Sequence, residues 1–234
     1  MFKEFVEKIV ALAAPNIEVI DGRDYTDKHL TLIEEPVPGP IRLSTLSSLV
    51  EYIKTGIDKA PGKIIEIISP IEVNLLSELN ELQQRKEYVQ VSYDMPCFPF
   101  GMQLQIEDFI VGLQAKFVRE GGDFAEVLEV VGNIKEDMVS TMKDDGVSQK
   151  VIVAAGIENV EGKIVPNPVT LKPFRTFPDV DQPASQFVLR MSSGFKCALH
   201  EADGEAWKIE AMANIKKWLE EQLKEVEDAP VILA

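Results

Sequence analysis

The sequence has few of the residues that most often build reactive or cross-linked sites. Its two cysteines, Cys97 and Cys197, form no CxxC motif, so the sequence indicates neither a disulfide framework nor a paired-cysteine zinc site. We expect both cysteines to be buried free thiols in a reducing cytosol, and a disulfide between them is the alternative. The two histidines, His29 and His200, are far apart, and neither has a partner at metal-ligand spacing. We therefore predict no metal site and no cofactor.

Motifs of nucleotide-binding and catalytic sites are also missing. The sequence contains no GxxxxGK[ST] phosphate loop, no GxGxxG and no GxSxG. Acidic residues are so abundant that a pair of carboxylates is not a specific sign of acid–base catalysis. We predict no catalytic residues and no enzyme activity. An enzyme or nucleotide-binding protein of an unrecognised class is kept as an alternative.

Positive charge is scarce. The chain has 24 Lys and Arg against 39 Asp and Glu, for a net charge of −15, and no cluster of basic residues. Such a charge repels phosphate backbones, so direct binding of nucleic acid is not expected. The simpler interpretation of the acidity is solubility. The more specific hypothesis is an acidic surface that mimics DNA for a basic partner.

Long apolar runs are missing as well. No stretch approaches the ~20 apolar residues of a membrane helix, and residues 1–14 mix acidic, basic and apolar residues, unlike a signal peptide. We expect a soluble cytoplasmic protein without membrane contact.

The apolar content, 45%, is ample for a core. Its periodicity predicts an α+β fold in a single domain over 1–234, with antiparallel sheets packed by amphipathic helices and a possible subdivision near 94–104. Ser44 is the expected N-cap of one helix, and Asp123 with Glu126 resembles a capping box of another. The expected helices cover 2–14, 45–56, 106–117, 124–131 and 205–223. On the last of them we expect Trp207 and Trp218 in the core, with a cofactor or partner groove around them as the alternative.

Strands are predicted where β-branched and apolar residues alternate. Asp21–Asp27 is predicted to be a polar turn, and Asp145-Gly146 a hairpin turn between 138–143 and 147–155. The other expected strands are 17–20, 29–33, 64–68, 73–76, 88–93, 186–190 and 195–199.

The least ordinary segment is a proline-rich arm over 162–185. Its five prolines exclude a helix and favour an edge strand or an extended arm. Arg175 is followed by Asp179 and Asp181, and we expect Arg175 to pair with one of these acids and hold the arm; an exposed recognition side chain is the alternative. If the arm binds a partner, the candidate residues are Arg175, Asp179, Asp181 and Gln182.

The C-terminal tail is apolar where a loose terminus is usually polar. Val231, Ile232 and Leu233 follow Pro230, which prevents the preceding helix from continuing. Either the tail packs on its own chain, or it adds to the sheet edge of a neighbouring copy. We predict a homo-oligomer with these three residues as one of its contacts.

Residues 43–223 resemble the YfdQ-like family of phage and prophage proteins, a family of unknown function. The resemblance lies in the order of LSSLVEYI, IIEIISP, IEDFIVGLQAKF and EVLEVVGNI, and most specifically in VPNPVTLKPFRTFPDVDQPASQFVLRM. It implies a phage-encoded protein of the host cytoplasm and supplies no catalytic residues. We expect an accessory protein that acts by protein–protein contacts during infection or lysogeny, for example an anti-defence or host-takeover inhibitor. A virion-associated structural protein is an alternative.

Overall fold

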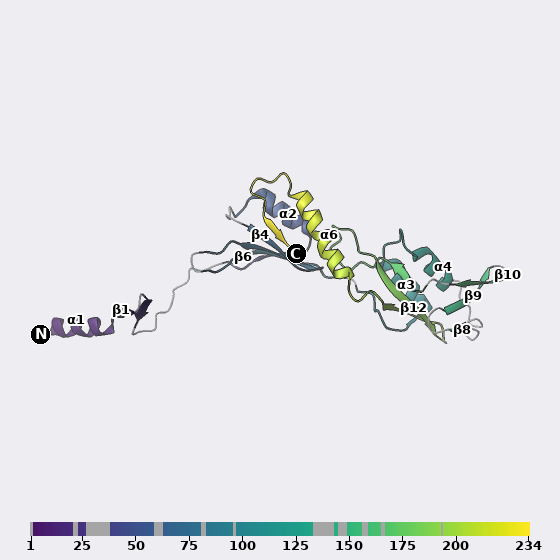
Figure 1. The fold of residues 1–234 in the computed structure, drawn as a ribbon, viewed down its shortest axis with the longest axis horizontal. Coiled ribbons are helices and arrows are strands. Elements are labelled where there is room, and N and C mark those ends of the chain that lie inside the picture. The colour runs from purple at the N-terminus through teal and green to yellow at the C-terminus, as the bar shows by residue number, and fades with distance from the viewer. Residues whose placement is uncertain are drawn as a thin grey trace. The chain divides into compact units, whose positions relative to one another are not determined.

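The computed structural model describes residues 2–20, 23–26, 38–58, 63–80, 83–95, 97–132, 143–144, 149–155, 159–164, 167–192 and 194–234. They form an α+β fold (Figure 1). The chain divides into two compact units, 1–38 and 39–234, where the sequence suggested one domain. Every described side chain of residues 2–20 and 24–26 is exposed, so these residues form no core of their own.

The first unit contains a helix and a hairpin. Helix α1 (Phe2–Ala13) is amphipathic and begins and ends close to its predicted bounds. Strand β1 (Ile17–Ile20) pairs antiparallel with β2 (Arg23–Thr26). The predicted polar turn over 21–27 is therefore wrong for 23–26, because Arg23–Thr26 supply the backbone partners of β1. The strand predicted at 29–33 lies outside the described residues.

A mixed five-stranded sheet forms one half of the second unit. Its central strands β4 (Lys63–Ser69), β5 (Glu72–Ser77) and β6 (Glu87–Ser92) run antiparallel, as predicted. Two short edge strands, β14 (Val231–Leu233) on β4 and β3 (Ile41–Leu43) on β6, are parallel to their neighbours. The sequence predicted only antiparallel pairing, so the sheet differs from the prediction at its two edges.

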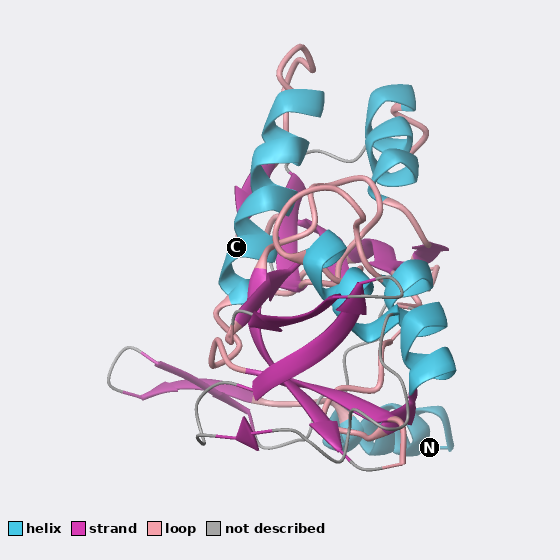
Figure 2. Ribbon diagram, turned by 90° about the vertical axis from the view of Figure 1, so that its right-hand side faces the viewer, coloured by secondary structure: helices cyan, strands magenta, loops and turns pink. Residues whose placement is uncertain are grey.

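Helices α2 (Leu46–Thr55) and α6 (Trp207–Gln222) contact each other and the five-stranded sheet (Figure 2). The alternate positions of the strands that are buried, such as Ile65, Leu75 and Val89, form one core with Leu49 of α2 and Ile215 of α6. This is the arrangement expected of a sheet with one solvated face.

An antiparallel four-stranded sheet forms the other half, in the order β11 (Val169–Leu171), β12 (Ser185–Ser192), β13 (Lys196–Glu201) and β7 (Leu104–Gln105). Helix α3 (Ile106–Lys116) packs on β13, and α4 (Phe124–Gly132) packs on β11 and on α3. The second core is rich in phenylalanine. Its ring contacts join Phe98, Phe100, Phe109, Phe117 and Phe187.

The segment 94–104 is where the chain passes from one core to the other. Tyr93 packs against the core of the five-stranded sheet, and Phe98 belongs to the core of the four-stranded sheet. Both cores nevertheless lie within the single compact unit 39–234, so the predicted subdivision marks a passage between two cores and not a boundary between units.

A third sheet contains β8 (Lys143–Asp144), β9 (Gln149–Ala155) and β10 (Asn159–Ile164), paired antiparallel in the order β10-β9-β8. The β8–β9 pairing agrees with the predicted hairpin. The turn Asp145-Gly146 and the rest of the first predicted strand, 138–142, lie outside the described residues.

Candidate functional site

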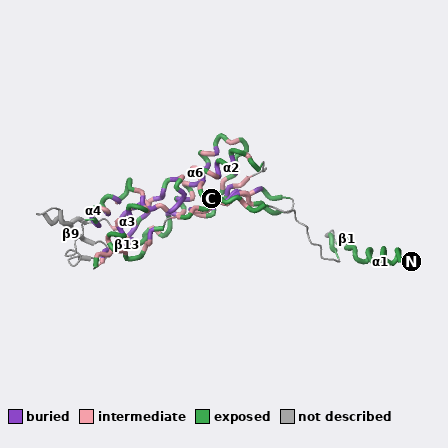
Figure 3. The backbone as a smooth tube through the Cα atoms, turned by 180° about the vertical axis from the view of Figure 1, so that it is seen from behind, coloured by how far each residue is buried: buried purple, intermediate pink, exposed green. Residues whose placement is uncertain are grey.

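The proline-rich segment is a buried strap, defined here as residues 167–185. It begins with β11 at the edge of the four-stranded sheet, as predicted, and Val169 and Leu171 are buried in the phenylalanine-rich core. Phe177 and Val180 are buried in the other core, under α2 and α6. The strap therefore crosses from one core to the other, and most of its residues are buried. Figure 3 colours the described backbone by burial. Residues 162–164 of the predicted arm belong to β10 instead.

Arg175 lies at the centre of the strap with only 3% of its surface exposed. Its Nη1 donates to Glu201 Oε1 at 2.6 Å, and its Nη2 donates to the Ser185 hydroxyl. The guanidinium also stacks on Trp207, with Cζ 4.1 Å from the ring centroid. The prediction that Arg175 pairs with Asp179 or Asp181 is wrong, because β13 brings Glu201 to it instead.

The electrostatics of Arg175 reflect this burial. Loss of solvent lowers the pKa of Arg175, and the nearby carboxylates Glu201 and Asp203 oppose that shift. The side chain is buried against aromatic rings and paired, which is the setting in which arginine is preferred to lysine. A side chain so enclosed holds the strap to β13 and α6, as expected of the pairing interpretation, and does not offer an exposed recognition group.

Gln182 closes the loop of the strap. Its Oε1 accepts from the backbone N–H groups of Arg175 at 2.8 Å and Thr176 at 3.2 Å. Its Nε2 donates to the carbonyls of Phe177 at 3.1 Å and Val180 at 3.3 Å. Because Gln182 is itself buried, it satisfies backbone groups that water cannot reach.

Asp179 caps a helix that is more than a hundred residues away in the sequence. Its carboxylate accepts from the backbone N–H groups of Leu46 at 3.3 Å and Ser47 at 3.1 Å, at the start of α2. The local N-cap is Thr45, whose hydroxyl accepts from Ser48 N, and not the predicted Ser44. A negative charge at this end also complements the helix dipole. Asp181 is exposed and is held through its backbone carbonyl, which accepts from Asn214 Nδ2 at 3.0 Å.

Beside the strap runs a groove along α6. It consists of adjoining hollows of about 500, 330 and 840 Å³. The half-buried Trp218 lines the first two, and Gln222 lines all three. We define the groove by the residues that line these hollows: Ser47, Val50, Glu51, Ile53, Lys54, Thr55, Pro178, Asp179, Val180, Asp181, Asn214, Lys217, Trp218, Glu221, Gln222, Lys224, Glu225, Val226 and Glu227.

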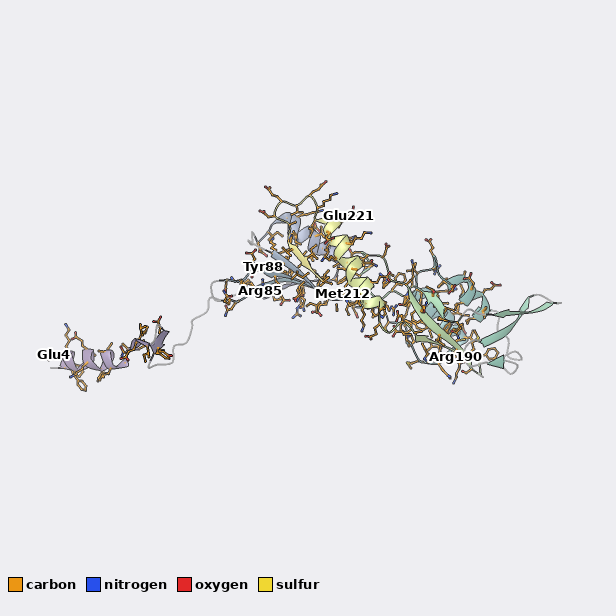
Figure 4. All side chains as sticks on the ribbon, in the orientation of Figure 1. Glu4, Arg85, Tyr88, Arg190, Met212 and Glu221 are labelled. Atoms are coloured by element: carbon orange, nitrogen blue, oxygen red, sulfur yellow. The ribbon has the colours of Figure 1, made fainter. Side chains whose placement is uncertain are left out.

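The groove is acidic. Six carboxylates line it, from Asp179, Asp181, Glu51, Glu221, Glu225 and Glu227, against three lysines, Lys54, Lys217 and Lys224. Glu221 projects from α6 into solvent (Figure 4). The groove thus combines one large aromatic side chain with an excess of negative charge, which suits a positively charged segment.

The structure brings together only part of the predicted binding set. Asp179 and Asp181 line the groove, whereas Arg175 and Gln182 are buried within the strap. Of the two tryptophans on α6, Trp207 is buried and packs on Arg175, and the half-buried Trp218 packs against the core and also lines the groove. Both rings therefore take part in core packing, as predicted, and a partner in the groove stays a prediction. Sequence reasoning missed Glu201 and Glu221, because neither stands out among 39 acidic residues.

The tail packs on its own chain. Val231–Leu233 form β14 and pair with β4, and Ile232 packs against the core. This was one of the two alternatives drawn from the sequence. Contact between copies through Val231 and Leu233, which are exposed, stays a prediction.

Two further findings bear on chemistry. Among the described residues, no group of three or more His, Cys, Asp or Glu side chains could hold a metal ion. Burial raises the pKa of the Cys197 thiol to about 12, so this thiol is protonated at neutral pH and unreactive.

Among the described residues, no helix is both long and apolar enough to cross a membrane. Comparisons with protein-family models, with curated proteins and with solved structures found no match.

Proposed function

We propose that this chain is an accessory protein that acts by binding another protein, and that the groove along α6 is its binding surface. The observation that carries the proposal is the juxtaposition of Trp218 with the acidic lining of the groove. Tryptophan is enriched among the residues that dominate binding energy, and a half-buried ring offers apolar area without the entropy cost of ordering a flexible side chain.

The charge of the groove indicates the chemistry of the partner. Six carboxylates against three lysines favour a lysine- or arginine-rich segment. The net charge of −15 adds a long-range attraction for a basic protein and repels nucleic acid. Because Asp179 is held by the N-terminus of α2 and by the strap, the rim of the groove is preorganised.

The biological setting rests on the resemblance to the YfdQ-like phage family. We propose that the protein works in the host cytoplasm during infection or lysogeny, and that an anti-defence or host-takeover inhibitor is the concrete form of this activity. A basic host protein would then occupy the groove. We propose no catalytic activity for this chain.

Affinity capture from infected host cells, followed by mass spectrometry, tests the proposal. Glu221→Lys reverses a charge in the groove, and Glu220→Lys makes the same change at an exposed neighbour outside the groove as defined above. We expect one reproducible basic protein with the unmodified chain and with Glu220→Lys, and its loss with Glu221→Lys. Equal capture by both variants would show that the groove is not the binding surface.

A further inference from the structure

Apolar side chains along one face of helix α1 are exposed. Phe2 is 82% exposed, Phe5 61%, Ile9 49% and Val10 64%. The accompanying hairpin β1–β2 leaves Val19 and other apolar residues exposed as well. A helix of 12 residues and a two-stranded hairpin are both marginal in water without packing against something else. The first unit therefore requires a partner surface.

The spacing of the apolar residues indicates what that surface is. Phe2, Phe5, Ile9 and Leu12 follow one another at intervals of three, four and three residues, which is the repeat of a coiled-coil seam. With Val6, Val10 and Ala13 beside it, the apolar face covers roughly 160° of the helix circumference, at 3.6 residues per turn. This is wider than the seam of a two-stranded coil and suits a helix that packs against more than one neighbour.

The charges on α1 favour a second copy over other occupants. Its polar face has Lys3, Lys8, Glu4 and Glu7, so the helix is formally neutral in a chain of net charge −15. Lys3 and Glu7 pair across one turn at 3.9 Å. Helices that bind membrane surfaces are rich in Lys and Arg on the polar face, whereas two glutamates balance the two lysines of α1. Identical helices without net charge can pack together without repulsion between the helices.

We propose that α1 is a self-association element, through which copies of this chain assemble by packing their Phe2, Phe5, Ile9 and Leu12 faces into one bundle. The groove of each second unit then occurs in several copies, which would strengthen binding to a multivalent or clustered partner. This inference does not depend on the proposed function, because α1 and the groove belong to different units.

Light scattering of the full-length chain over a range of concentrations tests the proposal. We expect a mass that is a multiple of 26.1 kDa, and a return to the monomer mass in the double variant Phe5→Glu, Ile9→Glu. Ala11→Glu, which adds the same side chain to the polar face of α1, is the matched control and should keep the oligomer.

Two readouts keep the outcome clear. Both tryptophans lie in the second unit, so unchanged tryptophan fluorescence melting shows that the double variant has not unfolded the rest of the chain. Flotation with vesicles of phosphatidylcholine and phosphatidylserine tests the membrane alternative. A monomeric full-length chain, an oligomer that survives Phe5→Glu, Ile9→Glu, or vesicle binding that the double variant abolishes would each overturn the proposal.

Discussion

The guanidinium of Arg175 lies against the ring of Trp207, with its Cζ 4.1 Å from the ring centroid, and this contact joins the strap to the first turn of α6. The same guanidinium binds Glu201 of β13. One buried cation thus joins the strap, a sheet strand and the helix that lines the groove.

Replacing Arg175 should therefore destabilise the protein. Arg175→Ala leaves Glu201 and Ser185 without their partner and a void beside Trp207. We expect the free energy of unfolding to fall by about 2–4 kcal/mol. This is at or below the usual cost of breaking a buried ion pair, because the Glu201 side chain is 38% exposed and water screens its charge. The melting temperature should fall by roughly 5–15 °C. Arg175→Lys should recover only part of this loss, because lysine lacks the planar guanidinium that donates to two partners at once. An unchanged melting temperature for Arg175→Ala would contradict this role.

Asp179→Asn tests the remote cap of α2. Asparagine keeps the shape and one acceptor but removes the charge that favours the helix N-terminus, so we expect a loss of about 1 kcal/mol. Asp181→Asn is the control, since Asp181 is held through its backbone carbonyl. Chemical denaturation of both variants measures the difference, and equal stabilities would show that the charge of Asp179 does not stabilise the start of α2.

Alanine substitutions at Gly122 and Gly121 test how closely the backbone of this turn approaches its neighbours. Both have positive φ, +64° and +83°, so alanine costs roughly 1 kcal/mol of strain at either position. At Gly122 the added Cβ would also lie 2.4 Å from the carbonyl oxygen of Thr170, whereas at Gly121 no atom of the described residues lies within 4 Å. Gly122→Ala should therefore destabilise the protein by about 2–4 kcal/mol, clearly more than Gly121→Ala. Similar melting temperatures would be inconsistent with the close contact between this turn and β11.

The two thiols should differ in reactivity. Cys97 is exposed and Cys197 is buried, so an aromatic disulfide reagent at neutral pH should label one thiol per folded chain and two per unfolded chain. The raised pKa of Cys197, about 12 against an ordinary 9.0, also has a linkage consequence. Above pH 9 the unfolded thiol loses its proton while the folded one keeps it, so the stability that Cys197 contributes is complete below pH 9 and is lost between pH 9 and 12. Cys197→Ala should reduce the loss of stability between pH 9 and 12. Rapid labelling of both thiols in the folded chain would contradict the burial of Cys197.

Deleting residues 229–234 separates the two interpretations of the tail. Because β14 pairs with β4 and Ile232 packs against the core, the deletion should lower stability. The mass in solution should not change, since assembly is assigned to α1. A fall in mass would instead support the contact between copies predicted from the sequence for Val231, Ile232 and Leu233.

The sequence predicted elements well where the signal is local. The strands β4, β5 and β6, the hairpin of β12 and β13, and the helices α1 and α3 all follow from periodicity, because alternation and helical spacing reflect burial directly. The turn at Asp123 shows where such signals fail. Its carboxylate accepts from Thr170 N at 2.7 Å instead of forming the expected capping box with Glu126, because β11 arrives from 47 residues away.

Contacts between residues that are far apart in the sequence could not be predicted, because local periodicity does not identify them. Nothing near Arg175 in the sequence identifies Glu201 or Trp207, and nothing near Asp179 identifies the N-terminus of α2. The division at residue 38 was also missed, because the apolar periodicity of α1 is that of a packed helix and does not say which surface covers it.

The central claim is that the groove binds a basic partner, and the dependence of that binding on salt tests it most directly. The affinity of the captured partner should be measured by titration between about 0.05 and 0.3 M salt for the unmodified chain, Glu221→Lys and Glu220→Lys. Exposed charges are screened over ~10 Å at 0.1 M salt, so we expect the affinity to fall steeply with salt, and Glu221→Lys to bind several-fold more weakly than Glu220→Lys at low salt. Affinity that is indifferent to salt and equal in the two variants would contradict the account.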